Sequence, residues 1–112
     1  MKSNLGKEDL KIVIPEGNKN HLFLKNEIIY IQSDKYYVYI HTEIKKKLVR
    51  ITLKKLESIL NKDYVRINKS IIINTQFVSQ IEYHKTSSRI LLTNGIEFFA
   101  SKTYNDNLRS VL

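Results

Sequence analysis

The sequence contains no cysteine, one proline and three glycines among its 112 residues. Without cysteine the chain has no disulfide, no thiolate nucleophile and no cysteine-ligated zinc site, which fits a reducing compartment. Three glycines do not make a glycine-rich phosphate loop, and no carboxylate pair or nucleophile motif is present. His21, His41 and His84 lack the spacing of metal ligands. We therefore expect a protein that is not an enzyme and that holds neither a metal nor another cofactor.

Long hydrophobic runs are also missing. The longest aliphatic runs, residues 28–31 and 71–73, are far shorter than the roughly 20 apolar residues that a helix needs to cross a bilayer. Residues 1–17 contain no apolar run of signal-peptide length. We expect a soluble, cytoplasmic protein that does not bind membranes.

Negative charge is scarce relative to positive charge. Nineteen Lys and Arg residues against eleven Asp and Glu residues give a formal net charge of +8, and so basic a balance favours a polyanionic partner such as nucleic acid. Abundant lysine can equally be a solvating surface, so charge alone leaves both interpretations open. The run at residues 45–47 is interpreted as a solvated hairpin tip that can add attraction for phosphate.

Short runs of β-branched and aromatic residues, separated by turn residues, predict a mainly antiparallel β domain of eight to ten strands. Residues 1–9 are polar without periodicity and predict a flexible tail or linker remnant, which leaves one domain at residues 10–112. Pro15 is expected to close the first strand, and Asn94-Gly95 predicts a type I′ hairpin turn. The predicted strands are 10–14, 21–24, 28–31, 36–40, 48–51, 64–68, 71–73, 76–83, 88–93 and 96–100.

Leucines at intervals of three and four predict one short helix at residues 52–60, with Thr52 as its N-cap. Lys54 and Lys55 in its first turn oppose the helix dipole, at a cost of roughly a few tenths of a kcal/mol each. Either such exposed positions tolerate this cost or an anion offsets it, and tolerance is the interpretation that we favour from the sequence. A second short helix is expected after Ser101.

The segment before the isoleucine run combines burial with positive charge. Tyr64, Arg66 and Asn68 alternate with apolar residues and point to one face, which is free to contact a ligand. The run at 71–73 has too few polar neighbours for a surface strand and is expected to be covered on both sides. The turn between the two strands carries Lys69.

A set of segments in a fixed order carries a family resemblance. The segments are Ile-Ile-Tyr-Ile at 28–31, the aromatic strand 36–40, Thr-Leu-Lys-Lys-Leu-Glu-Ser-Ile-Leu at 52–60, Tyr-Val-Arg-Ile-Asn-Lys-Ser-Ile-Ile-Ile-Asn at 64–74, Asn94-Gly95, and Ser-Lys-Thr-Tyr at 101–104. Together they resemble the LytTR DNA-binding domain, over about residues 10–112.

The resemblance implies the output domain of a bacterial transcription regulator, usually joined to a phospho-receiver domain in a two-component system. That receiver domain is absent from this chain. The implied fold is an elongated stack of small antiparallel β-sheets that binds DNA through loops at the sheet edges, without a recognition helix. The expected partner is double-stranded DNA with paired direct repeats, on which copies of the domain can self-associate.

By the same resemblance, three segments supply the DNA-binding residues. The residues are Lys35, Tyr36 and Tyr37, which follow Asp34; Arg66, Asn68 and Lys69; and Ser101, Lys102 and Thr103. The family often has His at the position of Asn68 and Arg at that of Lys102. Lysine at position 102 weakens planar, bidentate recognition of guanine.

The chemistry of these side chains suggests which of them contact the DNA backbone and which contact base edges. Lys69 and Arg66 are expected to contact the backbone or the minor groove, where cations give affinity with little sequence information. Lys35, Tyr36 and Lys102 are expected in the flanking grooves, where base edges are read.

Several of these residues have a structural alternative. Arg66 could pair with Asp63 or Glu82 on the surface. Asn68 could be a turn residue, and Tyr36 alternates with apolar neighbours and could belong to the core.

The sequence therefore predicts sequence-specific binding of double-stranded DNA by a transcriptional regulator. The alternative is a basic β module that binds RNA or single strands by stacking bases on tyrosines such as Tyr37 and Tyr39. A protein-interaction domain with incidental charge is a third hypothesis.

Overall fold

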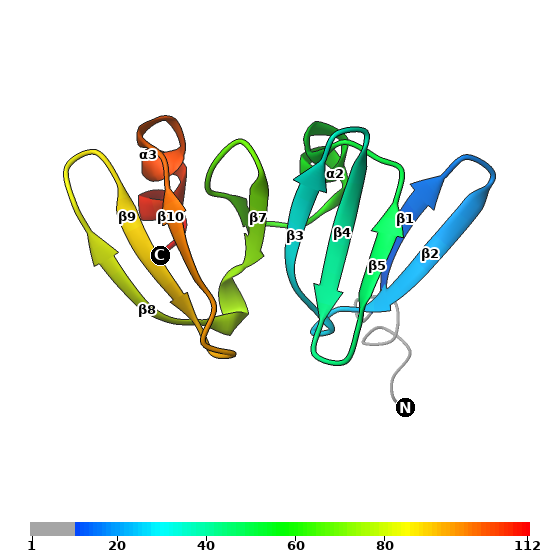
Figure 1. Cartoon of the computed structure of the whole chain (residues 1–112), viewed down its shortest axis with the longest axis horizontal. Helices are drawn as coiled ribbons and strands as arrows, with labels where there is room; N and C mark the ends of the chain where they lie inside the picture. Colours follow the sequence, from blue (N-terminus) through cyan, green and yellow to red (C-terminus); the bar gives the residue numbers. More distant parts are fainter. Residues whose placement is uncertain (1–10) are drawn as a thin grey trace, which may run out of the picture.

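The chain forms three antiparallel β-sheets in a computed structural model that describes residues 11–112 (Figure 1). The tail predicted at residues 1–9 lies outside the described residues. The sheets have the strand orders β1-β2, β5-β4-β3-β7-β6 and β10-β9-β8, so the predicted stack of small antiparallel sheets is confirmed. The elements are β1 (Lys11–Glu16), β2 (Lys19–Leu24), β3 (Ile28–Asp34), β4 (Tyr37–Thr42), β5 (Lys46–Val49), α2 (Leu53–Ile59), β6 (Tyr64–Arg66), β7 (Ile71–Asn74), the 3-10 turn η1 (Thr75–Phe77), β8 (Val78–Tyr83), β9 (Ser88–Leu92), β10 (Glu97–Ala100) and α3 (Lys102–Val111).

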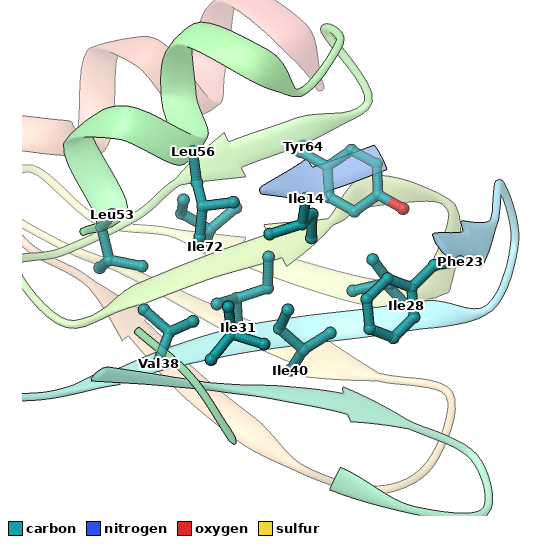
Figure 2. Packing of buried hydrophobic residues seen from close by; sticks show 11 residues of the cluster. Ile14, Phe23, Ile28, Ile31, Val38, Ile40, Leu53, Leu56, Tyr64 and Ile72 are labelled. Atoms are coloured by element: carbon teal, nitrogen blue, oxygen red, sulfur yellow. The ribbon is translucent and has the colours of Figure 1, made fainter. Parts of the chain in front are cut away.

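The five-stranded sheet lies between two hydrophobic cores. Figure 2 shows the first core, where Ile14 of β1 and Leu56 of α2 pack with Ile72 of β7. The second core lies on the other face, where Ile71 and Ile73 pack with residues of the three-stranded sheet and α3. Every residue of β7 is buried, because a strand with a layer on each side has no solvent face to fill with polar residues. The prediction for the isoleucine run is confirmed.

Tyr64 does not lie on a free face, contrary to the prediction. It is 9% exposed and belongs to the first core (Figure 2), and its hydroxyl donates to the Lys25 carbonyl at 3.1 Å. Burial, with a smaller contribution from Asp63, raises the pKa of this hydroxyl above its ordinary value. Successive residues of β6 enter opposite cores, since Val65 belongs to the second. The predicted alternation of side chains between the two faces of this strand is confirmed, but at Tyr64 both faces of the strand are covered by other parts of the chain.

Two predicted turns differ in detail. Pro15 lies inside β1, opposite Asn20 of β2, because each strand of a two-stranded sheet has an open edge where a proline leaves no ladder hydrogen bond unmade. The β9–β10 hairpin at Asn94-Gly95 exists, but only Gly95 has a positive φ, of 90°. Its N–H donates to the Leu92 carbonyl, as in a type I turn closed by a left-handed glycine, so the predicted type I′ turn is wrong.

Both predicted helices are present. The Thr52 side chain accepts a hydrogen bond from the Lys55 N–H at 3.1 Å and caps α2 as expected. The second helix, α3, runs for 10 residues after Ser101, which occupies the N-cap position without a side-chain hydrogen bond. Leu108 anchors α3 in the second core.

The antiparallel order places alternate connections at the same edge of the molecule. Figure 1 shows the β3–β4 turn, the β6–β7 loop and the start of α3 along the upper edge, and the β4–β5 and β9–β10 turns along the lower edge. The upper row follows the longest axis of the molecule, which measures 45 Å (Figure 1). The three segments that the family resemblance selected are therefore neighbours in space.

Candidate nucleic-acid interface

The β3–β4 turn presents two exposed residues. Asp34 pairs with Tyr37, so only Lys35 and Tyr36 form the turn, which begins later than the sequence predicted. Lys35 has a φ of 58°, a left-handed conformation that is uncommon for a residue with a side chain. Tyr36 is 73% exposed, which excludes its assignment to the core. Arg50 covers the ring of Tyr37, with its guanidinium carbon 5.9 Å from the ring centroid.

Arg66 holds the β6–β7 loop in place. Its Nε donates to the Asn68 carbonyl at 3.2 Å and its Nη2 to the Lys69 carbonyl at 2.8 Å. Its Nη1 pairs with Glu57 of α2 at 2.8 Å, so the alternative of a surface ion pair is correct in kind, although Asp63 and Glu82 were the wrong partners. The guanidinium also lies 5.3 Å from the Tyr104 ring centroid. Arg66 thereby connects the loop to both helices.

Asn68 has a structural role at the tip of the same loop. Its Oδ1 accepts a hydrogen bond from the Ser70 N–H at 2.8 Å, the local turn expected for this residue type. Its Nδ2 donates to the Phe99 carbonyl of β10 at 3.0 Å. Both functional groups of this side chain have partners within the chain.

Backbone hydrogen bonds join the three segments into one row. The Ser33 N–H donates to the Ser70 carbonyl at 2.9 Å, and the Ser101 N–H donates to the Ile67 carbonyl at 2.9 Å. The central loop is therefore bonded to the end of β3 on one side and to the start of α3 on the other. We call this row of residues 33–37, 66–70 and 101–103 the cationic edge.

Lysines supply the charge of the cationic edge. Lys35, Lys69 and Lys102 are exposed, and within residues 11–112 none of them forms an ion pair. Ser101 and Thr103 are exposed beside Lys102. The nine residues expected from the sequence thus fall on one edge, with a loop fixed by Arg66 and Asn68 and three ammonium groups that form no ion pair within residues 11–112.

A pocket of about 250 Å³ opens between two of the segments. Four cationic residues contribute to its wall, namely Lys35, Lys54, Arg66 and Lys69, and none of the described residues that line it is acidic. Sequence reasoning did not assign Lys54 to the site. The one indication in the sequence was that Lys54 opposes the helix dipole in the first turn of α2, a cost that a bound anion could offset. The fold places Lys54 beside Lys35, Arg66 and Lys69.

The lysine run at residues 45–47 lies away from the cationic edge. It begins in the β4–β5 turn at the opposite edge of the sheet (Figure 1), and Lys46 places its Nζ 4.8 Å from the Tyr39 ring centroid. The densest run of positive charge in the sequence is thus not part of the candidate interface.

The histidines are separated in the fold. His21 pairs with Glu16 and His84 with Glu82, whereas His41 stacks on Tyr30 with ring centroids 4.1 Å apart. Among the described residues no group of three or more potential ligands could hold a metal ion. In the same part of the chain, no helix has the length and apolar character to span a bilayer.

Comparisons with known proteins agree with the resemblance read from the sequence. A search of curated proteins finds no match. The chain is similar in structure to the LytTr DNA-binding domain of a Bacillus cereus protein described as a methyl-accepting/DNA response regulator, with a TM-score of 0.75. The identity is 17%, over 90% of this chain and 94% of that chain, a likeness that shows the fold alone. The family of LytTr DNA-binding domains matches residues 18–112, and the chain therefore belongs to that family.

Proposed function

We propose that this chain binds double-stranded DNA in a sequence-specific manner through its cationic edge, as the DNA-binding part of a bacterial transcription regulator. The observation that carries the proposal is the alignment of three separate segments in one row, each with an exposed lysine that has no ion-pair partner among the described residues. A duplex presents phosphates and base edges along a line, which a row of loops can follow. For this role the protein would act in the bacterial cytoplasm.

The dimensions of the molecule support a duplex lying along the edge. The longest axis is 45 Å, and successive major grooves on one side of B-DNA repeat after about 34–36 Å. The cationic edge occupies part of that length, because the β1–β2 and β8–β9 hairpins extend beyond it at the two ends of the molecule (Figure 1). The proposal directs the outer segments of the edge toward neighbouring major grooves and the central loop toward the backbone or the minor groove between them. One chain would occupy one repeat of a paired direct repeat, and two copies would meet on the DNA.

The proposed roles of the residues follow from whether their side chains already form hydrogen bonds within the chain. Lys35, Lys69 and Lys102 are exposed and can reach phosphates or base edges. Arg66 and Asn68 donate hydrogen bonds to backbone carbonyls of their own chain. We therefore assign them mainly to holding the central loop in its conformation. Arg66 keeps two of its five N–H groups for a ligand, since the described hydrogen bonds use one each from Nε, Nη1 and Nη2.

The tyrosines give less support to the alternative of single-strand binding. Base stacking requires an open aromatic face. Arg50 lies over Tyr37 and Lys46 lies over Tyr39, so each ring already has a cation on one face. Of the neighbouring tyrosines only Tyr36 has a largely open ring.

Selection of bound duplexes from a random pool tests the proposal. We expect enrichment of a repeated motif with a spacing near one helical turn, about 10–10.5 base pairs. Fluorescence anisotropy should then show tighter binding to the selected duplex than to either of its single strands. Tighter binding of a single strand, or a pool without an enriched motif, would contradict the proposal and favour the alternative.

A further inference from the structure

The pocket beside the cationic edge is built from parts of the chain that are distant in sequence. Its wall includes Lys35 from the β3–β4 turn, Thr52 and Lys54 from the start of α2, and Arg66 and Lys69 from the β6–β7 segment. We propose that this pocket binds one backbone phosphate of the duplex and so fixes the register of the domain on DNA without reading a base. The inference rests on the proposed function and adds a site with a different role.

The charges around the pocket suit an anion. Four of its lining residues are cationic, and Lys35, Lys54 and Lys69 form no ion pair within residues 11–112. Like charges gathered in one concave site repel one another and raise the local positive potential. A phosphodiester would relieve this repulsion, and charge-assisted hydrogen bonds to ammonium and guanidinium groups are the strong type.

The Thr52 hydroxyl and the fixed guanidinium of Arg66 complete the site. The Thr52 hydroxyl oxygen accepts from the Lys55 N–H, so its own hydrogen remains available for a phosphate oxygen. Arg66 is held by Glu57 and by two loop carbonyls, which orients its remaining N–H groups in advance. An anion would therefore meet a site with one fixed cation and three adaptable ones.

The size and position of the pocket favour a phosphate that belongs to DNA. Its volume of about 250 Å³ is several times the roughly 30 Å³ share of one water molecule, enough for a phosphate group and part of its hydration shell. Lys35 and Lys69 belong both to the pocket and to the cationic edge, so a duplex lying on that edge passes the mouth of the pocket. Lys54, which is not part of the cationic edge, then gains a role in DNA binding.

Adjacent lysines on α2 provide a matched test. Lys54 lines the pocket, whereas Lys55 is exposed on the same helix turn and does not line it. We expect Lys54→Ala to make the salt dependence of duplex binding less steep, with the slope of log K against log[salt] falling in magnitude by up to about 0.9, the contribution of one phosphate. The loss of affinity should be equal for selected and unrelated duplexes, because a phosphate carries no sequence. Lys55→Ala should keep the slope of the unchanged protein.

A second measurement separates the pocket from the proposed function. Inorganic phosphate is titrated into the 15N-labelled chain, and saturable shifts are expected at the amides of Lys35, Thr52, Lys54 and Lys69 but not in Lys54→Ala. Duplex binding with equal slopes for Lys54→Ala and Lys55→Ala would overturn the pocket and leave the proposed function standing. Phosphate shifts at these amides without duplex binding would overturn the proposed function and leave the anion site standing.

Discussion

Two lysine-bearing regions at opposite edges of the molecule differ in how they are assembled. The lower region is one continuous run, residues 45–47, at the start of β5, where Lys46 rests over the Tyr39 ring. The upper region, the cationic edge, collects single lysines from three segments that are joined by backbone hydrogen bonds. A local run makes a charged hairpin tip, whereas convergent loops make a line that can follow a duplex. Charge density along the sequence is therefore a poor guide to the proposed site.

The two regions also differ in how their side chains tie them to the rest of the chain. In the cationic edge, Arg66 and Asn68 bind four groups of the surrounding backbone and one carboxylate, which fixes where Lys69 is presented. In the β4–β5 turn the Thr42 side chain forms its hydrogen bonds with the Lys45 backbone alone. A binding edge needs such a preset geometry, because ordering a loop at the moment of binding costs affinity.

Removal of the central support should give the largest effect. We expect Arg66→Ala to lower the free energy of unfolding by about 1.5–3 kcal/mol, the range for hydrogen bonds to a charged group, and to weaken duplex binding as well. Urea unfolding measures the first effect. Arg89→Ala is the control, because the Arg89 side chain pairs with Glu82 and Glu97 on the exposed face of its sheet and such pairs stabilise little. Equal destabilisation by the two substitutions would show that Arg66 is not a special support.

Lys102→Ala should affect specificity more than stability. If its ammonium group reads a base edge, the substitution should relax the preference at one position of the selected site by about 1–3 kcal/mol. Competition binding with duplexes varied at each position measures this preference. Lys45→Ala, which removes the same charge at the lower edge, should leave the profile unchanged. A uniform loss at all positions in Lys102→Ala would instead assign Lys102 to a phosphate.

The smallest predicted effect concerns His41, on the half of β4 near the lower edge. Its Nε2 is buried without a hydrogen-bond partner among the described residues, and burial, with a smaller contribution from Lys46, lowers its pKa below the ordinary 6.5. The unfolded chain then binds a proton more readily than the folded chain, so this part of the stability is present above pH 6.5 and is lost as the pH falls through the lower, folded pKa.

Urea unfolding between about pH 7.5 and pH 5.5 checks this sign. The free energy of unfolding should decrease with falling pH, and His41→Phe, which keeps a ring next to Tyr30, should reduce that decrease. Glu16 has a pKa lowered from 4.5, chiefly by its hydrogen bond with His21, so its contribution is lost only in more acid solution. An identical pH dependence in His41→Phe would assign the effect to other groups.

Local chemistry allowed much of the fold to be predicted from the sequence. Three consecutive isoleucines predicted a strand covered on both sides, and the hydroxyl of Thr52 predicted the start of α2. The position of Pro15 depends on which strand edge is open, and the burial of Tyr64 depends on layers that arrive from β1 and β2. Asn94-Gly95 is compatible with two turn types, and the register of β9 and β10 decides between them.

The sequence allowed us to predict which segments contribute to the candidate site, but not how these segments contact one another to form a surface. The family resemblance selected the residues, but it could not show that the Ser33 and Ser101 amides bond to the central loop. The pairing of Arg66 with Glu57 and the arrival of Lys54 beside Lys69 depend on where α2 packs. Such contacts between distant segments come from the tertiary structure, which no local pattern contains.

One comparison of two triple variants tests the central claim most directly. Lys35, Lys69 and Lys102 are replaced by alanine in one variant, and Lys45, Lys46 and Lys47 in the other, so that each loses three positive charges. Duplex affinity is measured across a range of salt concentrations. We predict that the first variant loses at least about 0.9, the contribution of one phosphate contact, from the magnitude of the slope of log K against log[salt], and that the second keeps the slope of the unchanged protein. An equal decrease of the slope in the two variants would contradict binding through the cationic edge. It would show that duplex binding depends only on the net charge of the protein.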